Sequence, residues 1–244
     1  MWNTQVNYTR VKLCEFESLD AAYEASLLGA DALGFHIFNE HTDKGARPRR
    51  FAEIVRFLPR EVSKTLLTDV PFDELVDVLA TVPFDSIQLY PDWPAEEVLR
   101  LRASVGRPLR ILKVMSAQSA ENEPSDDEAF LERYANVVDA ILLDSYRIGG
   151  TGKVADWDHC RKIVESSDMP VFLAGGLNKD NVERAIATVN PFGVDVENGV
   201  GDWIPNGPLV KNLRKCREFL DAVAHADRKH LQTRARDVPN ARDP

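Results

Sequence analysis

The stretch that decides the fold is Ala140-Ile-Leu-Leu-Asp144-Ser-Tyr-Arg-Ile-Gly149-Gly150-Thr151-Gly152-Lys153. Its first four residues are apolar or small, which is typical of a strand buried on both faces. The strand ends on the carboxylate of Asp144, a glycine-rich turn follows, and Asp156 then begins a predicted helix. A carboxyl at this position can transfer a proton, and the bare amides of the turn can hold an anion such as phosphate. The same pattern also fits a plain strand, polar cap and turn, so the rest of the chain must decide.

The composition limits the partners of this protein. Its 244 residues are 44% hydrophobic with a formal net charge of -9. This acidic balance argues against nucleic acid or an anionic membrane as partner, although a local pocket of amides and arginine can still bind phosphate. No apolar run approaches the roughly 18 residues of a membrane span, and the first residues lack a signal-peptide pattern. The cysteines Cys14, Cys160 and Cys216 match no disulfide or zinc framework, so we expect a reducing, cytoplasmic location.

Strand-like and helix-like segments alternate along the chain. The predicted strands are Arg10–Phe16, Asp31–Phe38, Val62–Val70, Ser86–Tyr90, Leu109–Met115, Ala140–Asp144, Pro170–Gly176 and Gly193–Gly199. The predicted helices are Ser18–Gly29, Pro48–Leu58, Pro71–Val82, Pro94–Val105, Asp127–Val137, Asp156–Ser167, Asn178–Val189 and Gly207–Ala226. This pattern predicts an α/β fold, a single closed (β/α)₈ barrel over residues 1–226. The missing Gly-x-Gly-x-x-Gly turn after the first strand argues against an open, doubly wound sheet. Residues 227–244 are charged and have no apolar face, so we expect a disordered tail.

The ends of the predicted strands bring candidate residues to one mouth of the barrel. The side chains expected there are Cys14, Arg49, Gln88, Tyr90, Lys113, Asp144 and Asp195. The small-residue turns expected to form a phosphate cup contain Gly149, Gly150, Thr151, Gly152, Gly175, Gly176, Asn198 and Gly199. Each residue also has a purely structural interpretation: Cys14 as core, Asp144 as a helix cap, and Arg49 and Lys113 as surface. No spacing of His, Asp or Glu indicates a metal site, and we interpret His36 and His41 as ordinary rim residues.

Several motifs follow one another in the order of a known family. Val11-Lys-Leu-Cys14 is similar to its Val-Lys-Ile-Cys, and Pro48-Arg49 to its Ser-Pro-Arg. The other similar motifs are Gly29-Ala-Asp-Ala-Leu-Gly-Phe35, Ile87-Gln-Leu89, Leu142-Leu-Asp144, Gly149-Gly-Thr-Gly152, Leu173-Ala-Gly-Gly-Leu-Asn178 and Gly193-Val-Asp-Val196. With them, the chain resembles phosphoribosylanthranilate isomerase, an enzyme of tryptophan biosynthesis, from about Val11 to Val200.

This resemblance implies a ribulose-phosphate-binding type of barrel that catalyses an Amadori rearrangement. The family converts an N-(5-phosphoribosyl) amine into a 1-amino-1-deoxyribulose 5-phosphate without cofactor or metal. By resemblance, Cys14 is the base that takes the proton from C2, and Asp144 is the acid that protonates the ring oxygen. Arg49 is expected to orient the aryl carboxylate or the base. The resemblance leaves open whether the protein is a monomer or a homodimer.

The chain departs from the family around the ends of the substrate. Glu15-Phe16-Glu17 replaces Gly-Ile-Thr, Tyr90-Pro91 replaces His-Gly, and Glu197-Asn198-Gly199 replaces Ser-Ser-Gly. A carboxylate beside the thiol raises its pKa, and one beside a phosphate is unfavourable. We therefore expect weak activity on phosphoribosylanthranilate and better activity on another phosphoribosyl amine. The alternative is a barrel that binds a sugar phosphate or a partner protein without turnover. Glu15 and Glu197 favour that alternative, whereas retention of Cys14 and Asp144 opposes it.

Overall fold

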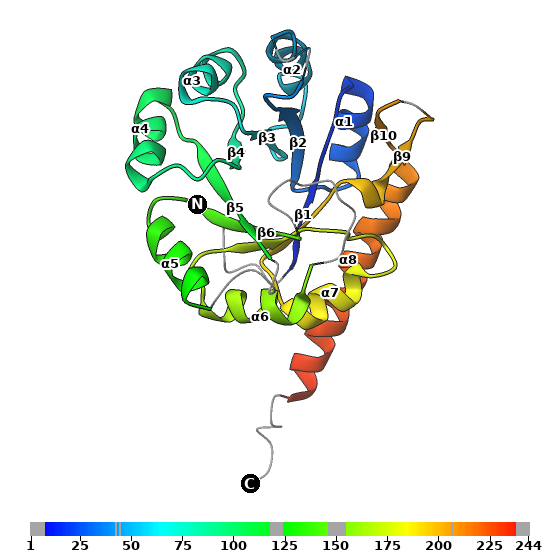
Figure 1. The fold of residues 1–244 in the computed structure, drawn as a ribbon. Helices are drawn as coiled ribbons and strands as arrows, with labels where there is room; N and C mark the ends of the chain where they lie inside the picture. The colour runs from blue at the N-terminus through cyan, green and yellow to red at the C-terminus, as the bar shows by residue number, and fades with distance from the viewer. Residues whose placement is uncertain are drawn as a thin grey trace.

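A parallel barrel forms the centre of the molecule (Figure 1). The computed structural model describes residues 8–41, 43, 45–117, 124–145, 155–205 and 207–237, without the side chains of 124, 125 and 233–237. Its barrel strands are β1 (Arg10–Leu13), β2 (Ala32–Ile37), β3 (Ser63–Thr68), β4 (Ser86–Leu89), β5 (Arg110–Ser116), β6 (Ala140–Asp144), β7 (Val171–Leu173) and β8 (Gly193–Val196). Each strand pairs in parallel with the next, and β8 closes the ring by pairing Asp195 with Lys12 of β1. The predicted (β/α)₈ barrel is confirmed.

The helices surround the barrel and follow the strands in order (Figure 1). They are α1 (Leu19–Leu27), α2 (Arg47–Val55), α3 (Phe72–Thr81), α4 (Ala95–Val105), α5 (Pro124–Tyr134), α6 (Trp157–Ser166), α7 (Val182–Val189) and α8 (Leu213–Asp237). Ser18 caps α1 through a hydrogen bond from Ala21 N, and Asp156 caps α6 through one from His159 N. Within the described chain, no helix has both the length and the apolar character needed to cross a membrane.

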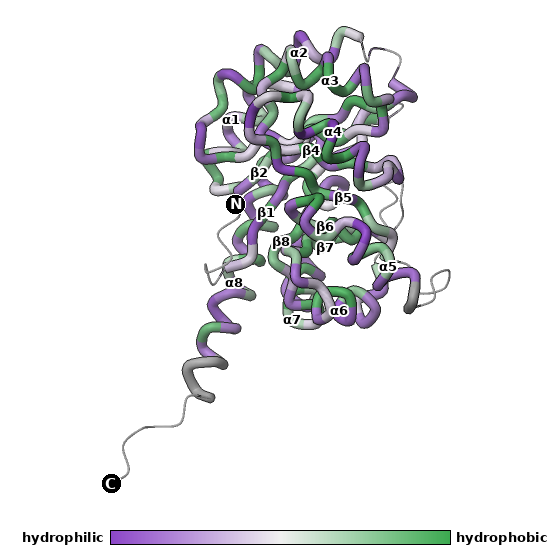
Figure 2. Tube along the Cα trace, turned by 90° about the vertical axis from the view of Figure 1, so that its left-hand side faces the viewer, coloured by the Kyte–Doolittle hydropathy of each residue, from purple (hydrophilic) through white to green (hydrophobic). Residues whose placement is uncertain are grey.

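The core is divided by the barrel wall. The larger part packs the outer face of the strands against the apolar faces of the helices, and Figure 2 shows the polar residues gathered on the outside of these helices. A smaller apolar cluster fills the barrel on the side of β5 to β7, and consists of Leu112, Val114, Ala140, Leu142, Phe172 and Ala174. The inward residues of the remaining strands are mostly polar, among them Lys12, Thr65, Gln88 and Asp195. A barrel that is apolar on one side and polar on the other has room for a buried polar site.

The connection after β8 and the C-terminal helix differ from expectation. A 3₁₀ turn, η1 (Asn198–Val200), leads into an antiparallel hairpin of β9 (Gly201–Trp203) and β10 (Leu209–Lys211), where the sequence suggested the start of a helix. Helix α8 then continues past Ala226 to Asp237, so the prediction of a disordered tail from residue 227 was wrong for residues 227–237. The carboxylate of Asp227 accepts hydrogen bonds from Thr9 N and Oγ1 at 2.9 and 2.7 Å, which ties this part of α8 to the entrance of β1. Residues 238–244 lie outside the described part.

Candidate active site

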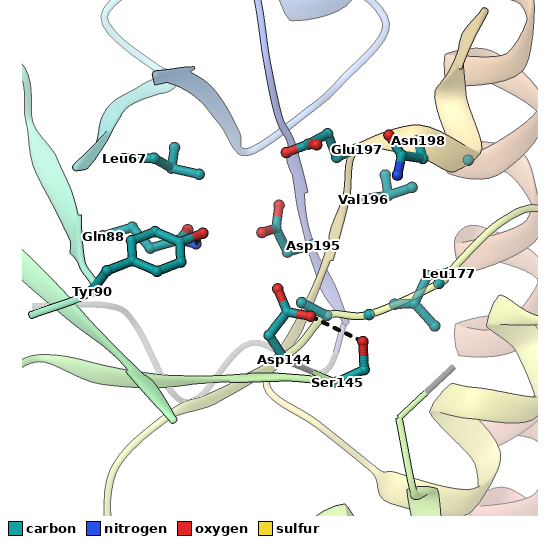
Figure 3. Close-up of a pocket in the computed structure, with 14 residues that line it drawn as sticks. Leu67, Gln88, Tyr90, Asp144, Ser145, Leu177, Asp195, Val196, Glu197 and Asn198 are labelled. Carbon is teal, nitrogen blue, oxygen red and sulfur yellow. Dashed lines mark hydrogen bonds between the residues drawn. The ribbon is translucent and has the colours of Figure 1, made fainter. Parts of the chain in front are cut away.

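A pocket opens where the strands end (Figure 3). Its lining combines polar side chains from β4, β6 and β8 with small residues from the turns after β7 and β8. It includes eight of the residues that the sequence predicts for the site: Gln88, Tyr90, Asp144, Gly175, Gly176, Asp195, Asn198 and Gly199. These residues are spread over nearly half of the chain, and the closed barrel brings them together.

Cys14 directly follows β1 and contacts Asp195, one of the residues that line this pocket. Its backbone N–H donates to Val196 O at 2.9 Å, and only 2% of the residue is exposed. The Cys14 Sγ accepts a hydrogen bond from Lys12 Nζ and lies 3.1 Å from Asp195 Oδ1. Burial and the charge of Asp195 raise the pKa of the Cys14 thiol well above its ordinary value, while the Lys12 ammonium opposes this shift. The resting thiol is therefore protonated, with a cation and a carboxylate in direct contact.

The two charges around the thiol form a buried ion pair. Lys12 precedes Cys14 by two residues, so both side chains leave the same face of the chain. Lys12 Nζ lies 3.0 Å from both carboxylate oxygens of Asp195. Burial alone would lower the pKa of Lys12, but Asp195 and Cys14 outweigh it and raise the pKa to about 12. Lys12 thus remains a permanent cation beside the sulfur, which favours a thiolate once the proton leaves.

Asp144 ends β6 and faces the centre of the pocket. It is 7% exposed, and Ser145 Oγ donates to its Oδ1 at 3.3 Å. Figure 3 shows the Asp144 carboxylate directed towards Asp195, the residue that contacts Cys14. Asp144 and Asp195 therefore both line the pocket, and the thiol after β1 contacts Asp195. Acid and base groups that act on one small molecule need such a common location.

Residues of the turns after β7 and β8 line another part of the pocket. Gly175 and Gly176 have φ of 86° and 63°, a left-handed conformation that favours glycine. A Cβ at Gly199 would lie 2.1 Å from Leu177 O, so only glycine allows the η1 turn to approach this close. These two turns both line the pocket, and phosphate binding by them stays a prediction. The third predicted turn, Gly149, Gly150, Thr151 and Gly152, lies outside the described residues.

Gln88 and Tyr90 form the wall next to β4. Gln88 Nε2 donates to Tyr90 Oη at 2.9 Å, and the Tyr90 ring packs edge-on against Phe38 with centroids 5.3 Å apart. Burial raises the pKa of Tyr90 well above its ordinary value, and Asp144 adds to this shift. Tyr90 is therefore a neutral phenol that presents a hydrogen-bonding hydroxyl to the pocket.

Comparison with known proteins decides the family. Residues 11–222 match the family described as N-(5'-phosphoribosyl)anthranilate (PRA) isomerase. The chain belongs to this family. It is similar to N-(5'-phosphoribosyl)anthranilate isomerase 2 of Methanosarcina mazei, with 32% identity over 200 residues that cover 79% of this chain and 86% of the relative. The enzyme of Halorubrum lacusprofundi is 36% identical over 78% of this chain and 87% of its own.

Solved structures of PRA isomerases share the fold. One, in complex with reduced 1-(o-carboxyphenylamino)-1-deoxyribulose 5-phosphate, has a TM-score of 0.70 and 25% identity, covering 89% of this chain and 99% of its own. The enzyme from Thermococcus kodakaraensis has a TM-score of 0.70 and 28% identity, covering 88% and 98%. Members of the family are named as isomerases, and the protein is accordingly an isomerase of the aldose–ketose type.

Two residues predicted for the PRA isomerase site lie elsewhere in this structure. Lys113 points out of the barrel, because Leu112 and Val114 on either side of it point inward. Its ammonium lies 3.2 Å from Tyr90 O and 3.2 Å from Asp92 Oδ1, against the rings of α5. Arg49 is an exposed residue of α2 and is not part of the pocket lining. Arg47, two residues earlier, is the arginine that contacts the barrel, through a 2.9 Å hydrogen bond to His36 O.

Charged and polar residues gather around Glu197, which lines the pocket. Glu197 and Glu15 were expected near the site, whereas Lys12, His36 and Lys211 were not predicted as part of it. Glu197 Oε2 lies 3.4 Å from His36 Nε2, and Lys211 Nζ lies 3.0 Å from Glu197 O and 3.9 Å from Glu15 Oε2. Burial and the nearby Glu15 raise the pKa of Glu197 to about 7, while Lys211 opposes the shift. The signal available in the sequence was a charged residue at an inward position of a buried strand, which marks Lys12 and His36. No such signal marks Lys211, because it belongs to β10 of the β9–β10 hairpin and not to a barrel strand.

Proposed function

We propose that this protein converts N-(5'-phosphoribosyl)anthranilate into its 1-amino-1-deoxyribulose 5-phosphate isomer, with Asp144 as acid and Cys14 as base. The observation that supports this most is that the Asp144 carboxyl and the Cys14–Lys12–Asp195 cluster lie at one mouth, beside a cup of glycine amides. The cup fits the phosphate end of the substrate, and the acid and base fit the sugar end.

The reaction follows from these positions. Asp144 gives its proton to the ribose ring oxygen as the bond between that oxygen and C1 breaks, which leaves an iminium between C1 and the amine nitrogen. Cys14 passes its own proton to Asp195, whose Oδ1 lies 3.1 Å from Sγ, and the thiolate then removes the proton from C2. The electron pair of that C–H bond forms the C1–C2 double bond, and the electrons of the iminium double bond move to the nitrogen. The resulting enol rearranges to the C2 ketone as C1 takes up a proton. Lys12 stabilises the thiolate, and Asp195 keeps Lys12 in place.

The surroundings of Glu15 support anthranilate as the amine portion. The expectation of a different amine depended on Glu15 facing the pocket and repelling the anthranilate carboxylate. Glu15 is not among the residues that line the pocket, and Lys211 lies 3.9 Å from its carboxylate. The charge that would repel anthranilate is therefore partly compensated, and the related enzymes are named for the same substrate.

Two experiments test this proposal. The purified protein is mixed with freshly prepared phosphoribosylanthranilate, and turnover is followed by the loss of substrate fluorescence. The gene is also placed in a bacterium that lacks its own isomerase, where growth without tryptophan is expected. Phosphate binding without turnover in either test would instead favour a barrel that binds sugar phosphates but does not catalyse. Cytoplasmic location and a monomeric or homodimeric state remain predictions.

A further inference from the structure

Three potential metal ligands meet on neighbouring strands at the mouth of the barrel. Cys14 follows β1, His36 belongs to β2, and Glu197 follows β8, and β1 pairs with both of the other strands. One ligand atom from each residue, the sulfur, a ring nitrogen and a carboxylate oxygen, lies within 4.8 Å of the other two. Within the described part of the chain, no other group of three or more His, Cys, Asp or Glu residues brings its ligand atoms this close together.

The imidazole of His36 points to a missing ligand. His36 is 9% exposed, and its buried Nε2 has no hydrogen-bond partner among the described residues. Buried polar atoms are nearly always satisfied, so an unsatisfied nitrogen aimed at a thiol and a carboxylate requires an explanation. A neutral imidazole whose other ring nitrogen carries the proton offers a lone pair at Nε2.

We propose that Cys14, His36 and Glu197 bind a zinc ion. Sulfur, imidazole nitrogen and carboxylate oxygen are the donors that zinc prefers, and three protein ligands leave one position for water. In a tetrahedral zinc site the ligand atoms lie about 3.3–3.6 Å apart. The 3.4 Å between His36 Nε2 and Glu197 Oε2 already meets this spacing, and the sulfur needs to move by only about 1 Å.

The neighbouring charges allow this change. Lys12 now contacts both the Cys14 sulfur and Asp195, so it can release the sulfur and keep the carboxylate as its partner. The cluster also holds more carboxylates than cations, with Glu15, Asp195 and Glu197 near Lys12 and Lys211. A divalent cation reduces this imbalance, and it replaces the thiol proton when Cys14 becomes a ligand.

Zinc at this position is an inhibitor of the isomerase and not its cofactor. This consequence depends on the proposed function, since the ion occupies the sulfur that removes the C2 proton. Binding itself is independent of that function, because the ligands are present whether or not the protein turns over substrate. The metal site can therefore be tested without a substrate.

The test uses the full chain, reduced and stripped of metals with a chelator. Cobalt(II) is the spectroscopic probe, and it should bind one per chain with a sulfur-to-cobalt charge-transfer band in the near ultraviolet. Zinc should displace the cobalt and abolish the band. Absence of a charge-transfer band on titration to millimolar cobalt would overturn the proposal.

Variants assign the ligands. His36→Ala and Glu197→Gln should each weaken zinc binding by about 100-fold or more, since even outer-shell changes cost 10- to 100-fold. Cys14→Ser should abolish the cobalt–sulfur band, whereas Cys216→Ala, which removes a buried thiol on α8, should preserve it. Unchanged zinc affinity in both folded His36 and Glu197 variants would refute the site. If a variant does not fold, the wild-type protein is alkylated with and without one equivalent of zinc. The proposal expects zinc to protect Cys14 from alkylation. Equal alkylation of Cys14 in both samples would refute the zinc site.

Discussion

Lys12 Nζ lies 3.0 Å from both carboxylate oxygens of Asp195, and this ion pair is buried beneath the mouth of the barrel. Removing one partner of a buried pair leaves an uncompensated charge. We therefore expect Asp195→Leu to lower the free energy of unfolding by about 3–5 kcal/mol, because Lys12 is left unpaired. The double variant Lys12→Met with Asp195→Leu should be more stable than Asp195→Leu alone. Urea denaturation of the three proteins measures both effects, and equal stability of the single and double variants would contradict them.

Cys14→Ser and Asp144→Asn should each reduce kcat/KM by about 10²- to 10⁴-fold, the usual contribution of a general base or acid. The fold should be preserved, since both changes are nearly isosteric. Steady-state kinetics measures the loss, and circular dichroism with the thermal midpoint checks the fold. Cys160→Ala is the control, because that thiol is buried in α6 outside the pocket. A near-native rate in Cys14→Ser would show that another group, such as Glu15 or Glu17, is the base.

Glu15 has φ of 64°, a backbone conformation that is costly for a residue with a side chain. We expect Glu15→Gly to be more stable than Glu15→Ala by about 1 kcal/mol, because both variants remove the carboxylate and only glycine relieves the strain. The control is the same pair of changes at Glu17, which is not among the described residues with positive φ. There the alanine variant should be the more stable one. Chemical denaturation gives the free energy of unfolding of the four variants. If the glycine and alanine variants rank in the same order at Glu15 and Glu17, the backbone of Glu15 is not strained.

Inorganic phosphate should bind the amides of the turns after β7 and β8. Titration should shift the NMR signals of Gly175, Gly176, Asn198 and Gly199, and signals that do not move at millimolar phosphate would exclude the cup. Gly199→Ala should weaken phosphate binding by about 10- to 100-fold, the value of one hydrogen bond to a charged group, since its Cβ would push η1 away from Leu177 O. Gly45→Ala should have no effect, because a Cβ at that position meets no atom within 4 Å.

The order of elements and part of the site could be predicted from the sequence. Periodicity is a local property, so alternating strands and helices indicated the barrel, and each strand end indicated which residues reach the mouth. Cys14, Gln88, Asp144 and Asp195 were placed correctly for this reason. Lys113 was predicted to point into the barrel, but its neighbours Leu112 and Val114 are the inward residues. Because successive side chains on a strand point to opposite faces, an error of one position in the strand reverses the predicted direction.

The charged cluster and the extent of α8 were decided only by the tertiary structure. The sequence by itself determined the alternation, the acid at the end of β6 and the thiol at the end of β1. It did not determine that His36 and Glu197 meet Cys14, because a contact between strands β8, β1 and β2 exists only when the ring closes. Nor did it predict order beyond Ala226, because that segment lacks an apolar face and is held by polar contacts from Asp227 to Thr9 and from Lys229 to Glu183. Residue types and local periodicity can be read directly from the sequence. These polar contacts join segments far apart in the chain, so they depend on how the closed barrel positions its strands and helices.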